Sequence, residues 1–327
     1  MTPETPPAAE LEHAAASLAA MRTEIHKAIA GQEEIVEQAL VGLLAAGHVL
    51  VEGVPGLGKT LLVKTLARTI GGTFARIQFT PDLMPSDVTG HTLYDPPSGR
   101  FTTRKGPVFA NFVLADEINR APAKTQAALL EVMQEAQVTI EGESHALVPP
   151  FMVFATQNPI EHEGTYPLPD AQLDRFLVNA RIGYPGAEDE VALTRQVTAS
   201  TVGERLSVDN VQQVLDPARV QRLQSLAAAI VVDDAVLAYA VRLARATRDS
   251  AMLAHGAGPR ASIALVRCGR ARALAEGRGF ATPDDVKSVA LPVLRHRVAL
   301  APELEIEGRG VDSVLEDLLG EVEAPRL

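Results

Sequence analysis

The sequence contains no tryptophan and a single cysteine, Cys268. One cysteine cannot form an intrachain disulfide, which excludes a disulfide-stapled fold and favours a reducing compartment. Aromatic residues make up only 4% of the chain, whereas hydrophobic residues make up 46%. The core must therefore be built mostly from alanine, leucine and valine, a composition that favours closely packed helices.

Positive charge is also scarce, because 41 Asp and Glu residues outnumber 30 Lys and Arg residues and give a formal net charge of -11. Such a chain lacks the large basic surface that attracts nucleic acids or anionic membranes. No apolar run reaches the ~18 residues of a membrane span. The first twenty residues contain three acids but no Lys or Arg, unlike a secretory signal. We expect a cytoplasmic protein with no nucleic-acid partner and no membrane insertion.

The chain has 327 residues, more than the ~250–300 at which a single core usually stops growing, so two subdomains are expected. In the first part of the chain, short apolar runs alternate with helical segments, which predicts a parallel sheet covered by helices on both faces. These runs are His48–Glu52, Phe74–Phe79, Phe112–Ala115, Met152–Ala155 and Leu177–Ile182. We therefore predict an α/β fold for this part.

Two stretches, at residues 90–106 and 137–148, interrupt this rhythm. Each has alternating segments around a turn, Pro96-Pro97-Ser98-Gly99 in the first and Gly142 in the second, which predicts inserted hairpins. Strand signals fade after Tyr184-Pro185-Gly186, and the remainder reads as helices. We predict a flexible tail at 1–10, an α/β subdomain at 11–190 and a smaller all-helical subdomain at 200–327.

A glycine-rich loop, Gly53-Val54-Pro55-Gly56-Leu57-Gly58-Lys59-Thr60, follows the first strand and opens a helix. It matches Gly-x-x-x-x-Gly-Lys-Thr, in which glycines let the backbone N–H groups and the positive helix end surround phosphates. Lys59 should reach the β- and γ-phosphates, and the Thr60 hydroxyl should ligate Mg²⁺. We expect the loop and the following Leu61 to bind a nucleotide; an ordinary glycine-rich turn is the alternative.

A phosphate-binding loop alone does not separate ATPases from GTPases or small-molecule kinases. The apolar strand Phe112–Ala115, however, is followed by Asp116 and Glu117, which places two acids at the carboxyl edge of the sheet. Asp116 would hold Mg²⁺ through water, and Glu117 would orient and deprotonate the attacking water. An acid pair is weak evidence by itself, but with the loop it predicts an Mg²⁺-dependent ATPase that forms ADP and phosphate.

Three further residues are candidates for the same chemistry. Asn158 follows the next strand, where its amide could hold the lytic water opposite Glu117, although an Asn before Pro159 also suits a turn. Arg175, just before the last strand, could reach the γ-phosphate of a neighbouring subunit or form an ion pair with Asp174 or another acid. Arg260 lies in the first turn of a helix, where positive charge is unfavourable. This position suggests that Arg260 has an anionic partner such as phosphate. The alternative is that Arg260 is simply exposed.

Together and in this order, the motifs resemble the MoxR family of AAA+ ATPases from about Ala30 to the final helices. The stretches that carry the resemblance are Gly31-Gln32-Glu33-Glu34, the loop Gly53–Thr60, Ala115-Asp116-Glu117-Ile118-Asn119-Arg120-Ala121, Ala155-Thr156-Gln157-Asn158-Pro159, Gly164-Thr165-Tyr166-Pro167-Leu168-Pro169, Gln172-Leu173-Asp174-Arg175-Phe176 and Gly258-Pro259-Arg260-Ala261.

The resemblance implies an AAA+ P-loop αβα core with a small helical lid, assembled as a ring that is typically a hexamer. It implies that Asn158 is sensor 1, Arg175 the arginine finger and Arg260 sensor 2, and that Gly31 lines the adenine. It leaves open whether Arg260 acts on its own subunit's nucleotide or on a neighbour's. The two hairpins would face the central pore or the client.

The resemblance also implies ATP-driven, chaperone-like remodelling that matures or activates partner proteins, often metal- or cofactor-dependent enzymes. A partner with a von Willebrand factor A domain is common, and here it would be a separate chain. One alternative is a nucleic-acid motor of the helicase type, although residues 137–148 contain no Lys or Arg. Another is a slow nucleotide-dependent binding switch, but Glu117, Asn158 and Arg175 together favour real hydrolysis.

Overall fold

The computed structural model describes the chain except for residues 1–5, 55, 98, 158–163, 201–207 and 326–327. Its centre is a five-stranded sheet with the order β2-β5-β8-β1-β9, in which all neighbouring strands are parallel. The strands are β1 (Val49–Glu52), β2 (Phe74–Gln78), β5 (Phe112–Asp116), β8 (Met152–Gln157) and β9 (Val178–Arg181). The predicted α/β class and the five apolar strands are confirmed.

Each face of the sheet has its own apolar core, because successive side chains of a strand point to opposite faces. Phe112 and Leu114 of β5 pack in the core formed with α1 (Ala8–His26), α2 (Glu33–Leu44) and α3 (Lys59–Ile70). Val113 and Ala115 pack on the other face, with α4 (Pro85–Thr89) and α5 (Ala123–Glu135). Burial on both faces explains why these strands read as continuous apolar runs.

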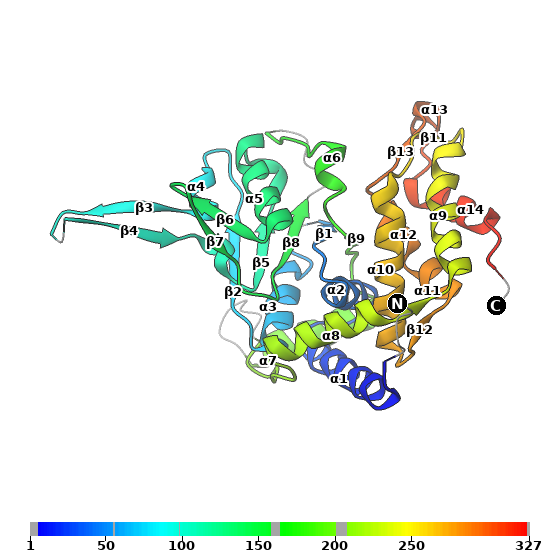
Figure 1. The fold of residues 1–327 in the computed structure, drawn as a ribbon, viewed down its shortest axis with the longest axis horizontal. Coiled ribbons are helices and arrows are strands. Elements are labelled where there is room, and N and C mark those ends of the chain that lie inside the picture. The colour runs from blue at the N-terminus through cyan, green and yellow to red at the C-terminus, as the bar shows by residue number, and fades with distance from the viewer. Residues whose placement is uncertain (1–5, 55, 98, 158–163, 201–207, 326–327) are drawn as a thin grey trace.

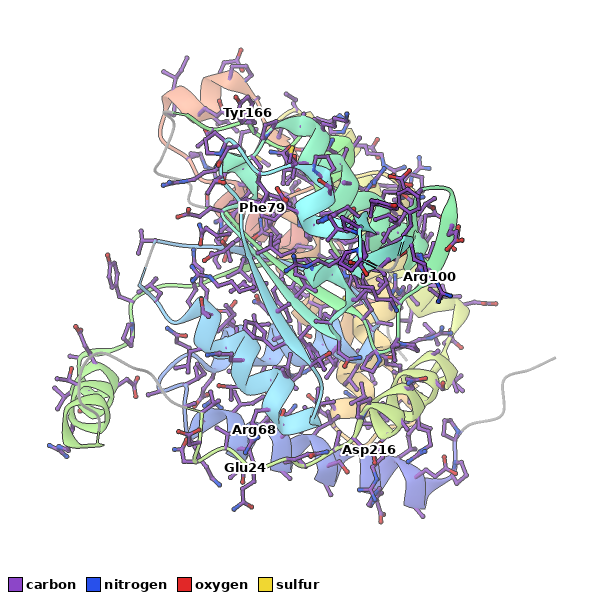
Figure 2. The ribbon with its side chains drawn as sticks, turned by 90° about the vertical axis from the view of Figure 1, so that its left-hand side faces the viewer. Glu24, Arg68, Phe79, Arg100, Tyr166 and Asp216 are labelled. Atoms are coloured by element: carbon purple, nitrogen blue, oxygen red, sulfur yellow. The ribbon has the colours of Figure 1, made fainter. Side chains whose placement is uncertain are left out.

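Two antiparallel hairpins extend from the α/β core. The longer one, β3 (Gly90–Asp95) with β4 (Arg100–Lys105), projects far from the sheet, as Figure 1 shows. Figure 2 turns this side toward the viewer, with Arg100 labelled at the start of β4. The shorter pair is β6 (Gln137–Ile140) with β7 (Glu143–Ala146), after α5. Both pairs lie in the stretches where alternating residues predicted hairpins.

The C-terminal part is a helical lid beside the sheet (Figure 1). Its helices are α8 (Pro217–Ala229), α9 (Asp234–Asp249), α10 (Pro259–Ala275), α11 (Pro283–Ser288), α12 (Ala290–Leu294), α13 (Pro302–Ile306) and α14 (Val311–Glu321). The prediction of a helical subdomain is confirmed, but the structure adds two small strand pairs. These are β10 (Val231–Val232) with β12 (Phe280–Ala281), and β11 (Leu253–His255) with β13 (Ala299–Leu300). Strands this short carry no detectable periodicity.

Core and lid are joined by packing and by the segment that precedes α8. Glu24 of α1 accepts a hydrogen bond from the backbone N–H of Gln212 (2.9 Å), and Arg68 of α3 donates to the carbonyl of Val211 (3.3 Å). Both side chains are labelled in Figure 2 near Asp216, which caps α8. The apolar core around α1, α2 and α3 continues into the lid helices without a break. The lid is therefore packed on the core.

Two further helices are α6 (Asp170–Leu173) and α7 (Ala187–Ser200). Helix α1 begins at Ala8, so the predicted tail at residues 1–10 extends too far, and Ala8 to Glu10 are helical. Alanines and a first-turn acid are favourable at a helix start, which explains the earlier beginning. Among the described residues, no helix is long and apolar enough to cross a membrane.

Candidate functional site

The glycine-rich loop lies at the carboxyl end of β1, which is between β8 and β9 in the sheet, and directly before α3. Gly56 and Gly58 have φ angles of 87° and 82°, a left-handed conformation that favours glycine over other residues. Gly58 is the N-cap of α3, so the first N–H groups of this helix face the loop. Lys59 Nζ donates a hydrogen bond to the carbonyl of Gly53 across the loop. Pro55 lies outside the described residues.

The loop forms one wall of a cavity of about 360 Å³, which we call the phosphate cleft. Its other wall comes from the carboxyl ends of the neighbouring strands. The lining residues are Gly56, Gly58, Lys59, Thr60, Leu61, Lys64, Arg76, Gln78, Asp116, Glu117 and Thr156. The structure therefore brings the predicted Lys59, Thr60, Asp116 and Glu117 together, as the parallel arrangement of β1 and β5 requires.

Thr156 holds the two acids of the phosphate cleft in place. Its Oγ1 donates to Asp116 Oδ1 (2.6 Å) and accepts the backbone N–H of Glu117 (2.8 Å). Glu117 has a φ of 56°, so this hydrogen bond supports a backbone conformation that is uncommon for a non-glycine residue. The sequence predicted a role for Asn158, which lies outside the described residues, but not for Thr156. A polar residue at the end of the buried run 152–155 was the available signal.

Strand β2 also contributes polar partners that the sequence interpretation did not assign. Arg76 forms an ion pair with Asp116 Oδ2 (2.6 Å), and Gln78 Nε2 donates to Glu117 Oε2 (2.7 Å). Both contacts follow from the register, which pairs Gln78 with Asp116. Sequence alone could not reveal them, because the order β2-β5 is a property of the folded sheet.

The charges in the phosphate cleft suit a nucleotide phosphate with Mg²⁺. Burial lowers the pKa of the Lys59 ammonium, although the nearby carboxylates of Asp116 and Glu117 oppose that shift. Lys59, Lys64 and the N-terminus of α3 offer positive charge to phosphate. Thr60 and Asp116 offer the oxygen ligands that Mg²⁺ prefers, alongside phosphate oxygens and water. No group of three or more His, Cys, Asp or Glu side chains that could hold a metal ion occurs among the described residues.

Gly31 lies just before α2, and its φ of 64° also favours glycine. The adjacent Gln32 donates from Nε2 to the carbonyl of Leu57 in the glycine-rich loop (3.3 Å). This contact brings the segment around Gly31 beside the loop. Val54 and Leu57 of the loop are partly exposed there. The predicted contact of Gly31 with adenine remains a prediction.

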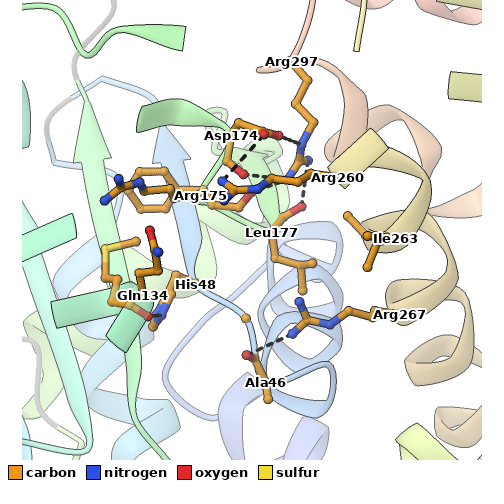
Figure 3. A pocket seen from close by; sticks show the side chains of 14 residues that line it. Ala46, His48, Gln134, Asp174, Arg175, Leu177, Arg260, Ile263, Arg267 and Arg297 are labelled. Carbon is orange, nitrogen blue, oxygen red and sulfur yellow. Dashed lines mark hydrogen bonds and ion pairs between the residues drawn. The ribbon is translucent and has the colours of Figure 1, made fainter. Parts of the chain in front are cut away.

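Arg175 and Arg260 lie in a different cavity of about 260 Å³, which we call the arginine cavity. Its lining residues are Ala46, Gly47, His48, Met133, Gln134, Asp174, Arg175, Phe176, Leu177, Arg260, Ile263, Ala264, Arg267 and Arg297. They come from the core and from lid helix α10 and the segment after α12. Figure 3 shows how core and lid meet there.

The arginine cavity contains four arginines, and among its lining residues Asp174 is the only acid. Asp174, which the sequence offered as a partner for Arg175, pairs instead with Arg297 (2.8 Å) and Arg260 (3.9 Å), as Figure 3 shows. The Arg260 side chain is 56% exposed, whereas that of Arg297 is 3% exposed. The cavity therefore carries an excess of positive charge, and part of it is accessible to an anion.

The two cavities lie at opposite ends of the strands of the sheet, the phosphate cleft at the carboxyl ends and the arginine cavity at the amino ends. The glycine-rich loop follows the carboxyl end of β1, whereas Arg175 precedes the amino end of β9. Because β1 and β9 are parallel and Val49 pairs with Val178, residues before β9 lie beside residues before β1. Strand β1 alone, with four residues, spans about 13 Å at ~3.3 Å per residue. Arg175 is thus separated from the phosphate cleft of its own subunit by the length of the sheet.

His48 lies on the core side of the arginine cavity. Its Nδ1 accepts the N–H of Val153 (3.0 Å) and its Nε2 donates to the carbonyl of Met133 (3.0 Å), which defines the tautomer. Burial lowers the pKa of His48 to about 4, and the Arg267 charge adds to this shift. The imidazole is therefore neutral near pH 7, and His48 has a structural role that joins β8 to α5.

Two family models match this chain. Residues 48–178 match a family described as the ATPase family associated with various cellular activities (AAA). Residues 245–318 match the AAA lid domain. The first match covers the strands β1 to β8 with the phosphate cleft and ends at the first residue of β9. The second covers most of the lid, including Arg260 and Arg297.

Similar proteins cover nearly the whole chain. Chaperone MoxR1 from Mycobacterium tuberculosis is 46% identical over 313 residues, which are 93% of this chain and 81% of that protein. Protein MoxR from Methylorubrum extorquens is 34% identical over 305 residues, which are 86% of this chain and 88% of that protein. A crystal structure of a candidate ATPase from Cytophaga hutchinsonii is 38% identical, covers 97% of both chains and has a TM-score of 0.88.

Proposed function

The chain belongs to the MoxR family of AAA ATPases, and from this premise we propose that it forms a ring with ATPase sites shared between neighbouring subunits. The observation that carries the proposal is the placement of the phosphate cleft and the arginine cavity at opposite edges of the sheet. A head-to-tail contact would bring the arginine cavity of one subunit onto the phosphate cleft of the next. Repeated around a closed ring, that contact completes every site.

Within one subunit, the phosphate cleft performs the chemical step. Lys59 and the N–H groups at the start of α3 bind the β- and γ-phosphates and stabilise the charge that develops on them. Glu117 accepts a proton from the attacking water, after release from Gln78 and from its ion pair with Arg120. Mg²⁺, held by Thr60 and through water by Asp116, would supply further positive charge at the phosphates. Asn158 as sensor 1 and Gly31 at the adenine remain part of the proposal.

Arg175 and Arg260 would act together on the γ-phosphate of the neighbouring subunit. None of the described residues of the glycine-rich loop lines the cavity that the two arginines share, which supports action in trans for both. Arg260 is largely exposed and can leave Asp174 for phosphate, since its ion pair of 3.9 Å is long. A protonated guanidinium beside the γ-phosphate stabilises the transition state for phosphoryl transfer.

We further propose that hydrolysis drives remodelling of a protein client, in a ring that is a hexamer. One relative at 46% identity is named a chaperone, which supports this kind of activity. The hairpin β3–β4 presents exposed apolar side chains, with Phe101 74% exposed and Tyr94 55% exposed. Such residues are available for contact with unfolded or partly exposed segments of another protein. A separate chain with a von Willebrand factor A domain would deliver the client.

The experiment that tests the shared site is hydrolysis as a function of protein concentration. The rate per subunit should rise as rings assemble and reach a plateau. In the Glu117→Gln variant, turnover should fall by about 10²–10⁴, the usual contribution of a general base, while ATP binding and assembly persist. Captured protein that co-purifies with this variant would identify the client. Equal rates per subunit in monomer and assembly would refute the shared site, and unchanged turnover in Glu117→Gln would refute Glu117 as the base.

A nucleic-acid motor stays the second candidate because of one observation. Strand β4 carries Arg100, Arg104 and Lys105, all exposed on the projecting hairpin. Basic side chains beside aromatic ones can contact a phosphate backbone and stacked bases. Single- and double-stranded DNA should leave the rate of hydrolysis unchanged if the client is a protein. Stimulation that is lost in the Arg100→Ala/Arg104→Ala variant would favour the second candidate.

A further inference from the structure

Arg297 is a lid residue whose side chain is buried against a short core segment, Asp174–Leu177, which we call the finger segment because it contains Arg175. Its Nε donates to Asp174 Oδ1 (2.8 Å). Its two Nη atoms donate to the carbonyls of Phe176 (2.5 Å), Leu177 (3.1 Å) and Asp174 (3.5 Å), and to Val293 in the lid. The residues on both sides of Arg175 are thus attached to one guanidinium.

All five N–H donors of Arg297 are used in these contacts, since a guanidinium has five donors and no acceptor. The side chain is only 3% exposed, so it has no donor and no accessible surface for a phosphate. Arg175 differs in its exposure, because it is partly exposed where it lines the arginine cavity. The two arginines therefore have different roles, although both lie in the same cavity.

The two residues before Arg297 reach the same part of the core. His296 Nε2 donates to the carbonyl of Phe176 (3.0 Å), and Arg295 Nη1 donates to the carbonyl of Asn179 in β9 (3.2 Å). Arg295 also pairs with Asp312 of α14 (3.3 Å), which pairs with Arg181 at the end of β9 (2.8 Å). Three consecutive lid side chains thus attach the finger segment and the following strand to the lid.

Burial of these charged side chains costs free energy, so stability alone does not explain the contacts. Burial lowers the pKa of Arg295 and of Arg297, which reflects the cost of removing two guanidinium groups from water. Apolar residues in such a position are often at least as stabilising as a buried ion pair. The forked N–H donors of a guanidinium fix carbonyl groups in direction as well as in distance, which apolar packing cannot do.

From this geometry we infer that Arg297 is a positioning residue that holds the finger segment to the lid, so that Arg175 points at the phosphate of the neighbouring subunit. The inference rests on the proposed shared site. Its consequence is that the lid of one subunit sets the geometry of its neighbour's active site. A movement of the lid would displace Arg175, because the carbonyls on both of its sides move with Arg297.

The first test compares Arg297→Met and Arg297→Lys with a control, Arg278→Met. Arg278 also bonds a buried carboxylate, Asp285 (2.5 Å), but its partners Asp285, Glu276 and Phe280 all lie in the lid. Arg297→Met should hydrolyse ATP about 10²-fold more slowly, the cost of a misplaced catalytic group, with unchanged ATP affinity and assembly. Arg297→Lys, which keeps the charge but loses the fork, should be intermediate. Equal losses in Arg278→Met would overturn the inference.

The second test mixes Arg297→Met with Glu117→Gln in equal amounts. Glu117→Gln subunits cannot hydrolyse ATP but present an intact finger, and Arg297→Met subunits have an intact phosphate cleft. In random rings about a quarter of all sites combine both intact halves, so about a quarter of the wild-type rate per subunit should return. No recovery would mean that Arg297 supports its own subunit's cleft, which would overturn the inference. If Arg297→Met does not fold, Arg297→Lys is mixed in its place, and the rate should again exceed the sum of the separate variants.

A parallel mixture of Arg175→Ala with Glu117→Gln separates this inference from the proposed shared site. Recovery in this mixture supports the shared site, and its absence refutes that site whatever Arg297 does. The double variant Arg175→Ala/Arg297→Met then tests positioning without reference to a neighbour. It should be no slower than Arg175→Ala, because a positioning residue has nothing left to position. A further loss of rate in the double variant would show that Arg297 acts independently of Arg175.

Discussion

The phosphate cleft and the arginine cavity are both charged pockets of this AAA ATPase, but they are built in different ways. The phosphate cleft belongs to the core alone, and its acids and amines face each other across a few residues of loop and strand. The arginine cavity forms where the core meets the lid, and it carries four arginines against one acid. In the proposed function, one pocket has the groups that bind phosphate and activate water, and the other has the groups that stabilise charge.

This difference explains why neither pocket would suffice alone. The phosphate cleft contains the candidate base Glu117 and the phosphate-binding Lys59, but neither Arg175 nor Arg260 lines it. The arginine cavity contains both of these arginines, but neither Lys59 nor Glu117 lines it. Two pockets that contain different parts of the proposed site, at opposite ends of the strands of one subunit, suit a head-to-tail interface. The comparison therefore predicts that changes in the two pockets have separable effects, in binding for one and in turnover for the other.

The largest expected effect comes from Arg175→Ala. Loss of an arginine finger should lower the rate of hydrolysis by about 10³–10⁵, whereas the affinity for ATP should stay nearly unchanged, because Arg175 does not line the phosphate cleft of its own subunit. Equilibrium binding of a fluorescent ATP analogue and steady-state hydrolysis would measure the two quantities. A large loss of ATP affinity in the monomer of this variant would contradict the assignment of separate roles to the two pockets.

The second effect concerns Arg260, whose partner the sequence left open. Arg260→Ala should slow hydrolysis by about 10²–10³, the range for loss of one group that stabilises the transition state. If Arg260 serves the neighbouring subunit, mixing this variant with Glu117→Gln should restore part of the rate. Steady-state hydrolysis of the mixture measures this. An additive mixture, with weaker ATP binding by Arg260→Ala itself, would assign Arg260 to its own nucleotide.

A smaller effect is expected from Thr156→Val on the side of the phosphate cleft. The substitution removes the hydroxyl that bonds Asp116 and the backbone of Glu117. A hydrogen bond to a charged group is worth about 1.5–3 kcal/mol, so the rate should fall by about tenfold or more, and half-maximal activity should need more Mg²⁺. Titration of the rate with Mg²⁺ tests this.

The control for this change is Thr69→Val, because Thr69 lies on α3 and its hydroxyl donates to the carbonyl of Leu66 in the same helix (2.8 Å). Thr69→Val should lower the free energy of unfolding slightly and leave the Mg²⁺ dependence unchanged. If both variants shift the Mg²⁺ dependence equally, Thr156 has no special part in holding the two acids.

The last expected effect, on stability and not on turnover, is a loss of stability in acid that involves His48 of the arginine cavity and the nearby lid residue His296. The pKa of His48 is about 4 in the folded protein, and that of His296 is also lowered by burial. Because these values lie below the ~6.5 of an unfolded chain, the unfolded state takes up protons first as the pH falls. The stabilising contribution is therefore complete above about pH 6.5 and is lost toward pH 4. For His48 the loss at pH 5 is about 2 kcal/mol.

Urea unfolding at pH 7 and pH 5 measures this loss. In His48→Gln, whose amide can keep both hydrogen bonds without titrating, the difference between the two pH values should shrink by that amount. Hydrolysis at pH 7 should be unaffected, since His48 is neutral there. An unchanged pH dependence in His48→Gln would place the acid-sensitive group elsewhere in the molecule.

The residues of each pocket that could be predicted from the sequence are those that lie close together along the chain. The glycine-rich loop is contiguous, and Asp116 and Glu117 follow directly after an apolar run, so local pattern and spacing were sufficient to predict both. The partners Arg76 and Thr156 each lie 40 residues from Asp116. They depend on which strands are neighbours, and the order β2-β5-β8 has no local signature. Their roles therefore had to come from the folded sheet.

The arginine cavity was less predictable because its parts lie even further apart. Arg297 and Asp174 are separated by 123 residues, and nothing near Arg297 in the sequence points to a partner in the core. The sequence offered Asp174 as a partner of Arg175, a reasonable expectation for adjacent charges. In the structure that carboxylate faces the lid and pairs with Arg297 and Arg260. Packing of the lid on the core decided this contact.

The sequence by itself determined the alternation of apolar strands and helices, the phosphate-binding loop and the acids that follow β5. These features depend on short-range periodicity and on residues a few positions apart, which act through local backbone geometry. Only the tertiary structure decided that Arg175 lies at the edge of the sheet opposite the loop, and that a lid arginine holds it. Parallel strand pairing and burial at the seam between core and lid bring together residues that local sequence does not relate.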